Sequence, residues 1–368
     1  MNMTEEQIVR FLNQRVEMWS FSRLLHENYS GKIPLQMLLS EKLTEYKGMR
    51  GEDTKGTARK IRNWLNDVNR PVNRETLFQI CFAMGLDEGS ADKVLCSTAE
   101  SGIHYRNPRE MIYAFCLRKS YDYPKAQELI RRLEERRDPG ERQEQLSARN
   151  LPQEERYLTI SVRDEFKSVQ SEDELIRFLE KYRRSLGVRR NTAYAKFSLM
   201  MSQLIEGGSG NEEIGIVPGE KRYSLKQVTD QYLRMGIPYE RKSRSYSRLQ
   251  KEIKKHWPSA KTMEEMYSGK ADVNRKTLLL LYFATEGMDP RIQEENYAGE
   301  HCRRINLMLS ECGMALLDPH NPFDFLILQS LRIKNEDDSM SRRMERFLWQ
   351  VFKGSMAYIN PADETGKM

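Results

Sequence analysis

The sequence predicts a nearly all-α protein in which two related helical modules are joined by a helical central segment. Three observations lead to this prediction: apolar residues recur at helical spacing along most of the chain, strand-like alternation is weak, and two sequence blocks occur twice in the same order. The chain has 368 residues, enough for two or three domains, and its 39% hydrophobic content is sufficient for real cores. These values argue against disorder over the full length.

Helical periodicity begins near the N-terminus, where apolar residues such as Ile8, Leu12, Phe21 and Leu25 recur close to i, i+3, i+4 spacing. The weakest assignment is Tyr157–Val162, which fits either a strand or the start of a helix. Helices are expected at 5–28, 34–46, 56–66, 74–85, 90–99, 108–119, 123–137, 171–186, 191–206, 224–235, 246–257, 259–268, 275–286, 302–316, 322–333 and 340–353.

Three helix starts have a clear physical basis. Asn107–Pro108 and Asn321–Pro322 each place an N-cap residue before a proline in the first helical position, where its missing N–H costs nothing. Ser171 and Glu174 have the spacing of a capping box. These three sites predict where helices begin.

Two polar, helix-breaking stretches suggest the domain organisation. Residues 138–156 are polar and poor in large apolar side chains, and residues 207–221 are rich in glycine. We therefore expect an N-terminal helical module over 1–137, a linker and central helical segment over 138–221, and a second module with a C-terminal helix over 222–368.

The chain contains an internal repeat. Residues 72–83 (VNRETLFQICFA) match 273–284 (VNRKTLLLLYFA) at seven of twelve positions, and 107–118 (NPREMIYAFCLR) resemble 321–332 (NPFDFLILQSLR). This order predicts a duplicated module over roughly 20–118 and 225–333. The alternative is two unrelated helices that share common caps.

The first copy of the repeat resembles a known family over residues 21–86. Gln36–Leu43, Thr57–Leu65, Asn69–Pro71 and Glu75–Leu86 resemble the second helix, third helix, turn and fourth helix of the phage-repressor-like helix-turn-helix family (Cro and lambda repressor, or XRE). The resemblance implies a DNA-binding domain, with a degenerate second copy near 225–288. The sequence departs from the family at Thr44–Gly56, which is longer than the family's tight turn.

The third helix of the first module is strongly basic independently of any resemblance. Residues 54–74 carry six basic residues and one acidic residue, a net charge of +5, against +6 for the whole chain. Ile61, Trp64 and Leu65 share the face expected to pack inward, so the basic residues face outward or flank the core. An α-helix fits the major groove, where Arg pairs with guanine and Asn with adenine. The alternative is a solvated basic face on a protein-binding helix.

The second module is expected to contribute mainly phosphate contacts. Its equivalent third helix, 259–267, contains Glu264 and Glu265, which would repel phosphate, whereas residues 241–255 are strongly basic. Tyr239, Tyr246 and Trp257 are interspersed there and are expected to pack more often than to stack on bases. The DNA-binding residues expected over both modules are Gln36, Lys55, Thr57, Arg59, Lys60, Arg62, Asn63, Arg70, Arg244, Arg248, Lys251, Lys254 and Lys255.

The expected function is double-stranded DNA binding, with a role in transcription regulation implied by the family resemblance. The main alternative is a helical adaptor that binds another protein or a ribonucleoprotein without sequence-specific DNA reading. An RNA-binding alternative predicts preference for single strands and sensitivity at Tyr239 or Trp257. A homodimer is left open.

Other classes of protein receive little support. No apolar run reaches the roughly eighteen residues of a membrane helix, and the acidic N-terminus lacks an apolar signal core, so a cytoplasmic location is expected. The five cysteines show no CxxC spacing and are expected to be buried free thiols. The five histidines form no zinc pattern, and the P-loop and GxSxG motifs are absent. We therefore expect no catalytic residue, metal or cofactor.

Overall fold

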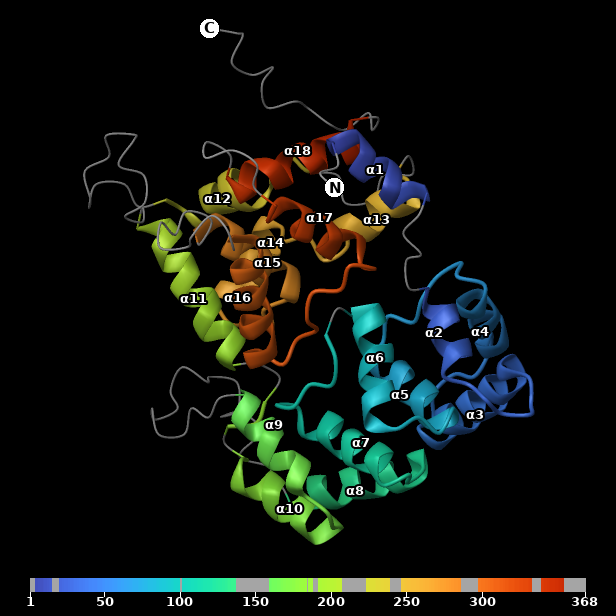
Figure 1. Ribbon diagram of the computed structural model, residues 1–368. Helices are drawn as coiled ribbons and strands as arrows, with labels where there is room; N and C mark the ends of the chain where they lie inside the picture. Colours follow the sequence, from blue (N-terminus) through green and yellow to red (C-terminus); the bar gives the residue numbers. More distant parts are fainter. Residues whose placement is uncertain are drawn as a thin grey trace, which may run out of the picture. The chain divides into compact units, whose positions relative to one another are not determined.

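The all-α prediction is confirmed by the computed structural model, in which the described residues form helices and no β-strand (Figure 1). The structure describes residues 4–14, 20–99, 101–136, 159–183, 185–187, 191–206, 223–238, 246–285, 297–332 and 339–353. The predicted linkers at 138–156 and 207–221 lie outside these ranges.

The chain divides into two compact units. The first unit comprises Trp19–Thr192 with Ser310–Ala315, and the second comprises Met1–Met18, Ala193–Leu309 and Leu316–Met368. The two module boundaries expected at 137 and 221 lie outside the described residues. The placement of the N-terminal residues in the second unit was not expected from the sequence.

The first unit is built around a continuous apolar core that includes Phe21, Leu39, Ile61, Phe78 and Phe115, each with almost no exposed surface. Helix α4 packs against α2 and α3, α5 packs against α3 and α6, and α7 packs against α8. Its helices are α2 (Phe21–Glu27), α3 (Leu35–Met49), α4 (Thr57–Leu65), α5 (Arg74–Ala83), α6 (Glu88–Ala99), α7 (Pro108–Arg118), α8 (Tyr123–Glu135), α9 (Thr159–Ser168) and α10 (Glu172–Lys181).

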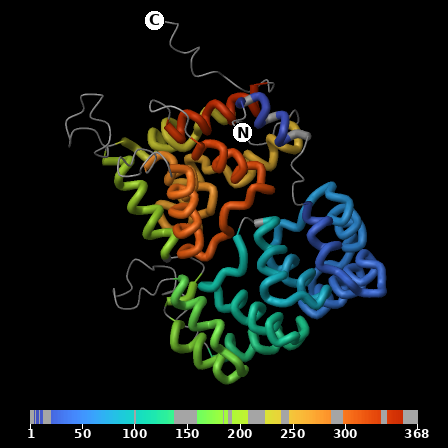
Figure 2. The backbone as a smooth tube through the Cα atoms, in the orientation of Figure 1, coloured from blue at the N-terminus to red at the C-terminus, as the bar shows by residue number. Residues whose placement is uncertain are grey.

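In the second unit, α1 packs along α18 (Figure 2). The Phe11 ring of α1 also stacks on the Phe325 ring of α17, with centroids 5.4 Å apart. The helices of the second unit are α1 (Glu5–Gln14), α11 (Asn191–Ile205), α12 (Leu225–Val228), the π-helical turn η6 (Thr229–Leu233), α13 (Arg248–Lys254), α14 (Ala260–Tyr267), α15 (Arg275–Thr285), α16 (Tyr297–Glu311), α17 (Pro322–Ser330) and α18 (Met340–Phe352).

The three predicted N-cap residues are confirmed, but the reciprocal bond of the capping box at Ser171 is not formed. The Asn107 side chain accepts from the backbone N–H groups of Arg109 and Glu110, and Asn321 accepts in the same way from the second and third residues of α17. Ser171 accepts from the Glu174 N–H, while the Glu174 carboxylate accepts from the N–H of Gln170. The short polar side chains thus satisfy backbone donors that the first helical turn leaves without partners.

Three expectations about helix extent need correction. The alternative of a strand at Tyr157–Val162 is wrong from Thr159 onward, because α9 begins there and buries Val162 and Phe166. The single helix expected over 5–28 is two helices in different units, and Ser20 caps the second by accepting from Arg23 N–H. The helix expected over 224–235 is a short α-turn followed by a π-turn.

The matched sequence blocks form the same ion pair in both units. Arg74, in the first turn of α5, donates twice to the Glu110 carboxylate of α7, with both distances 2.6 Å. Arg275, at the start of α15, donates twice to Asp324 of α17, at 2.8 and 2.7 Å. These residues occupy corresponding positions in the two copies of the repeat.

The backbone around these ion pairs also corresponds. Glu110 accepts from the N–H of the residue six positions before it, and Asp324 does the same, at 2.8 and 2.9 Å. Arg74 also donates to the carbonyl of Gly102, and Arg275 to that of Leu316, which lies 214 positions later. This shared hydrogen-bond pattern supports the predicted repeat.

No helix in the described part of the chain is long and apolar enough to cross a membrane. All five cysteines are free thiols, as expected, but only Cys81, Cys116 and Cys312 are buried, whereas Cys96 and Cys302 are partly exposed.

Candidate nucleic-acid interface

Helix α4 is fixed to the first unit by one apolar face. Ile61 is fully buried and Trp64 is 6% exposed, both packed in the core formed with α2 and α3. Leu65 is only partly buried. The spacing of Thr57, Ile61 and Trp64 places one residue on the inner face in each turn, which leaves the opposite face to solvent.

The outer face of α4 is cationic. Arg59, Lys60 and Arg62 are exposed, and the helix contains no acidic residue. Among the described residues, none of these three side chains forms an ion pair or a side-chain hydrogen bond. Asn63, on the same side of the helix, is partly buried. The structure therefore places these four predicted residues on or beside one accessible face of α4.

The N-terminal end of α4 has no side-chain cap, although the Thr57 N–H donates to the Thr54 carbonyl at 3.2 Å. Its cap residue, Gly56, has a φ of 72° and supplies no side-chain hydrogen bond. Lys55 is exposed just before it, and its backbone N–H is bonded to Asp53 Oδ1 at 2.9 Å. First-turn N–H groups without a side-chain acceptor, next to lysines, are suited to an anionic partner.

Thr57 corrects one of the sequence-based assignments. It is only 2% exposed, and its hydroxyl donates to the Thr54 carbonyl at 2.8 Å. The Lys47 ammonium, itself buried, donates to the same hydroxyl at 3.3 Å. Thr57 therefore joins α3 to α4 and is not available for a phosphate contact. Burial, together with the positive charge of Lys60, lowers the pKa of Lys47.

The basic stretch is also less open than its charge count suggests. Arg74 is neutralised by Glu110, which lies outside the stretch in sequence. Arg70 is partly buried, and its guanidinium donates to the Ser97 carbonyl at 3.3 Å, which ties the turn to α6. Lys55, Arg59, Lys60 and Arg62 remain as the exposed cations of residues 54–74.

The insertion between the second and third helices, Thr44–Gly56, is helical only in its first part, up to Met49. Helix α3 continues to Met49, and residues 50–56 form a hydrogen-bonded connection in which Gly51 and Gly56 both have positive φ. Gln36, the second residue of α3, is exposed. Helix α3 and its connection to α4 are therefore both longer than the corresponding parts of the helix-turn-helix family pattern.

A partly buried polar network that the sequence analysis missed anchors the end of α3. Glu75 Oε1 accepts from the hydroxyls of Tyr113 and Tyr123, each at 2.6 Å, and from Arg50 Nη1 at 2.7 Å. Lys276 occupies the corresponding position of the second copy, and it donates to the Ile253 carbonyl at the end of α13 instead. The change from Glu75 to Lys276 between the two matched blocks was the sequence signal that could have pointed to this network.

The second unit presents a weaker cationic surface. Arg248 and Lys251 are exposed on α13, whereas Lys254 is partly buried and lies over the Tyr246 ring at 4.7 Å. Lys255 caps α13 and is partly buried. Arg244 lies outside the described residues. On α14, Glu264 is exposed and Lys261 lies 3.9 Å from Glu265, so this helix is not cationic, as predicted.

The aromatic residues of this region pack rather than present open rings. Tyr246 is 3% exposed, and the Trp257 indole N–H donates to the Leu233 carbonyl while its ring packs edge-on against Phe323. Tyr239 lies outside the described residues. The Trp257 side chain is partly exposed, so base stacking there, which the RNA-binding alternative requires, stays a prediction.

The described residues contain no cluster of three or more His, Cys, Asp or Glu side chains that could hold a metal ion. No protein-family model, curated protein or solved structure matches this chain. The helix-turn-helix assignment thus stays a prediction based on the residues of α3 to α5.

Proposed function

We propose that this protein binds double-stranded DNA through the outer face of α4, with Arg59, Lys60 and Arg62 as the principal contacts. The observation that carries the proposal is a cationic helical face without acidic neighbours on the same helix, whose opposite face is fixed in a core. The basic side chains of such a helix can contact the phosphate backbone without first breaking ion pairs or hydrogen bonds within the protein.

The start of α4 supports the same proposal. Phosphate can accept from first-turn N–H groups after Thr57, which no side chain caps, and Lys55 and Lys60 add positive charge beside them. The buried Lys47 raises the local positive potential further. In the second unit, Arg248 and Lys251 supply additional phosphate contacts without base reading.

The test is a measurement of affinity for a random-sequence duplex at increasing salt concentration, by fluorescence anisotropy. For wild type we expect log Kd to rise linearly with log salt. Replacing Arg59, Lys60 and Arg62 together by Ala should reduce the slope by about 0.9 for each phosphate that the variant no longer neutralises.

The matched control removes the same charge from elsewhere on the first unit. Lys93, Lys167 and Arg177 are exposed and lie outside α4, so replacing all three by Ala should leave most of the affinity. Thr57→Val is a second control, because its hydroxyl points inward and its removal should leave the salt slope unchanged.

The rival functions make different predictions for the same variants. An equal loss of affinity in the α4 triple variant and in the control would sink the proposal, as would no duplex affinity at low salt. A tight protein partner in the latter case would favour the adaptor alternative. Preference for single strands that survives the α4 substitutions would favour RNA binding.

A role in transcription regulation is a further part of the proposal and rests on the family resemblance. It requires specific sites that bind more tightly than random duplex. At such a site, removal of one arginine that pairs with guanine should cost about 1–3 kcal/mol and relax the preference at that base pair. Catalysis and a bound cofactor are not part of this proposal.

A further inference from the structure

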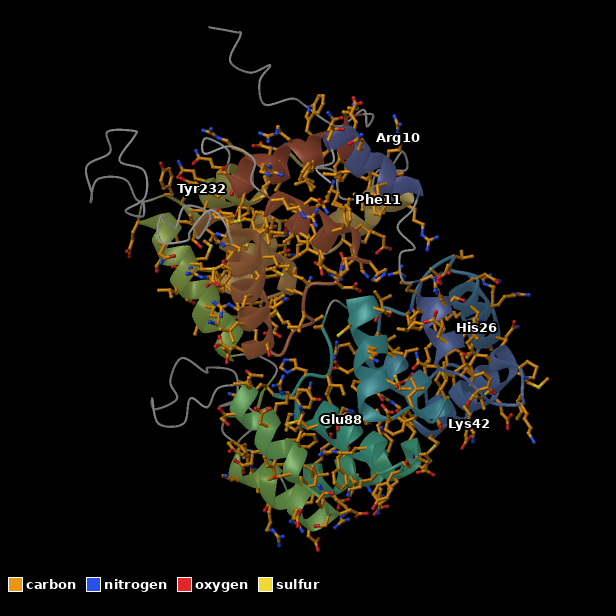
Figure 3. All side chains as sticks on the ribbon, viewed as in Figure 1. Arg10, Phe11, His26, Lys42, Glu88 and Tyr232 are labelled. Carbon is orange, nitrogen blue, oxygen red and sulfur yellow. The ribbon has the colours of Figure 1, made fainter. Side chains whose placement is uncertain are left out.

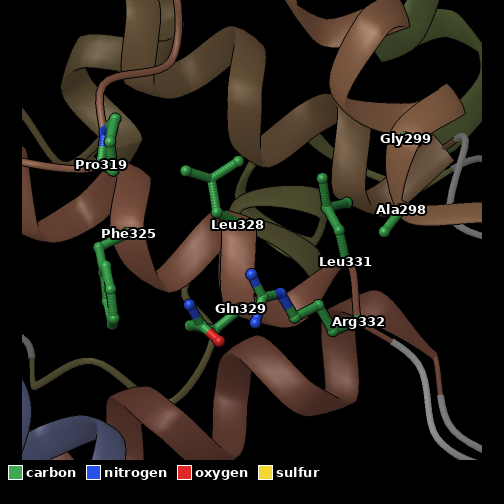
Figure 4. A pocket seen from close by; sticks show the side chains of 8 residues that line it. All are labelled: Ala298, Gly299, Pro319, Phe325, Leu328, Gln329, Leu331 and Arg332. Atoms are coloured by element: carbon green, nitrogen blue, oxygen red, sulfur yellow. The ribbon is translucent and has the colours of Figure 1, made fainter. Parts of the chain in front are cut away.

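The second unit contains a pocket of about 370 Å³ that the DNA-binding proposal does not use (Figure 4). Ala298 and Gly299 of α16 line one side, and Pro319 precedes the helix that lines the other. Phe325 and Leu328 come from α17, and Arg332 follows it. The lining is mostly apolar, with one exposed guanidinium at the edge.

In the first unit, a side chain of α9 occupies the place that corresponds to this pocket. By the same 214-residue offset that relates Glu110 to Asp324, Arg332 corresponds to Arg118 and Pro319 to Tyr105. In the first unit Phe166 of α9 lies between these two side chains. Its ring centroid is 4.6 Å from the Arg118 guanidinium carbon and 5.9 Å from the Tyr105 ring.

Arg118 also holds the end of α9. Its Nη1 donates to the carbonyls of Phe166 and Lys167, at 3.3 and 2.8 Å, so it satisfies acceptors that the last helical turn leaves open. Its Nε lies 3.1 Å from the carboxylate of Glu88, the first residue of α6 (labelled in Figure 3). In the first unit, the partners of Arg118 are therefore an aromatic ring, two backbone carbonyls and one carboxylate.

The second unit retains the arginine but not these partners. Residues Ala298 and Gly299 at the start of α16 supply no carboxylate to the pocket. Within the described ranges the Arg332 guanidinium forms neither an ion pair nor a hydrogen bond. In the described part of the second unit, the pocket is an apolar recess beside a guanidinium without a charged partner, whereas a helix fills the corresponding place in the first unit.

We propose that this pocket binds an amphipathic helix of a partner protein, as the first unit binds its own α9. The partner helix places an aromatic side chain among Pro319, Phe325 and Leu328. Its last carbonyls accept from Arg332, and a nearby carboxylate of the partner balances that arginine. The buried face of the partner helix is expected to resemble that of α9, which consists of Thr159, Val162 and Phe166. This inference does not depend on DNA binding.

The test uses full-length protein and a labelled peptide with the sequence of residues 157–170, which carries the α9 pattern. A second peptide has a photo-crosslinking phenylalanine analogue at the position of Phe166. We expect saturable binding, with crosslinks to the segments that contain Ala298, Pro319 and Leu328. Replacing the phenylalanine of the peptide by alanine should weaken binding about tenfold, the usual effect of removing a central aromatic anchor.

Substitutions in the protein localise the effect. Leu328→Glu places a charge in the recess and Leu328→Trp fills it without adding charge, so each should weaken binding about tenfold or more. Arg332→Ala should weaken it by a smaller factor, whereas the matched control Arg342→Ala, on an exposed part of α18, should have no effect. Far-ultraviolet circular dichroism verifies that each variant is folded.

Three results would overturn the proposal. Crosslinks confined to α6, α7 or α10 would show that the peptide only exchanges with α9 in the first unit. Binding that occurs only after removal of residues 354–368, or only when self-association is disrupted, would make the chain itself the occupant. Absence of saturable binding to the wild-type chain would refute the helix-binding site directly.

Discussion

Removal of Asp324 should destabilise the second unit more than removal of Glu110 destabilises the first. The two carboxylates hold corresponding arginines, but their surroundings differ. The side chains of Arg275 and Asp324 are 3% and 2% exposed, whereas those of Arg74 and Glu110 are 29% and 9% exposed. The guanidinium left behind by Asp324→Ala therefore has little access to water.

The expected magnitudes follow from this difference. Asp324→Ala leaves a buried charge without its counterion and removes the acceptor of the Asp318 N–H, so it should cost about 3–5 kcal/mol. Glu110→Ala should cost less, about 1.5–3 kcal/mol, because Arg74 regains water and still donates to Ser101 and Gly102. The difference between the variants should be about 2 kcal/mol.

Hydrogen exchange with mass spectrometry is the suitable assay, because two units need not unfold together. Peptides from α15 and α17 report on Asp324→Ala, and peptides from α5 and α7 report on Glu110→Ala. The double variant Arg275→Met/Asp324→Leu should recover much of the stability, since it leaves no unpaired charge. If Glu110→Ala costs as much as Asp324→Ala, the burial argument is wrong.

Two further predictions concern the first unit. A Cβ at Gly102 would lie 2.0 Å from Asp92 Oδ1, so Gly102→Ala should destabilise the unit by about 1–3 kcal/mol. A Cβ at Gly48 would meet no atom within 4 Å, so Gly48→Ala, in a helix, should stabilise the unit by about 0.5–1 kcal/mol. Urea titrations that give the opposite order would contradict this. Although burial alone would raise the pKa of Glu110, hydrogen bonds and positive charge from Arg74 hold it below the ordinary value of 4.5. The stabilisation by Glu110 is thus complete above pH 4.5 and lost as the pH falls through the lower folded pKa. Glu110→Gln should remove that part of the pH dependence of unfolding.

Local sequence signals were sufficient for most of the helices. The Asn–Pro pairs at 107 and 321 and the Ser171 cap act through hydrogen bonds within a single helical turn, so they do not depend on distant residues. Apolar periodicity located α3, α4 and α5 for the same reason. It could not show that residues 5–28 form two helices that belong to different units.

The candidate interface was predictable in part. Alternation of apolar and basic residues in α4 correctly placed Ile61 and Trp64 inside and Arg59 and Arg62 outside. The same reasoning misplaced Thr57, because the neighbour that covers it, Lys47, belongs to another helix. Position within one helix cannot reveal such a contact.

The amino-acid order alone determined the helical class, the repeated blocks and the charge of α4, since these depend on neighbours three or four residues apart. Folding decided which charges stay open to a partner. Arg74 and Arg70 lose their place in the basic surface through groups more than twenty residues away, Glu110 and the Ser97 carbonyl. Likewise, only the folded chain shows that α9 covers Arg118 in the first unit, whereas a pocket lies beside Arg332 among the described residues of the second unit. Whether such a place is filled depends on long-range packing, which residue spacing does not encode.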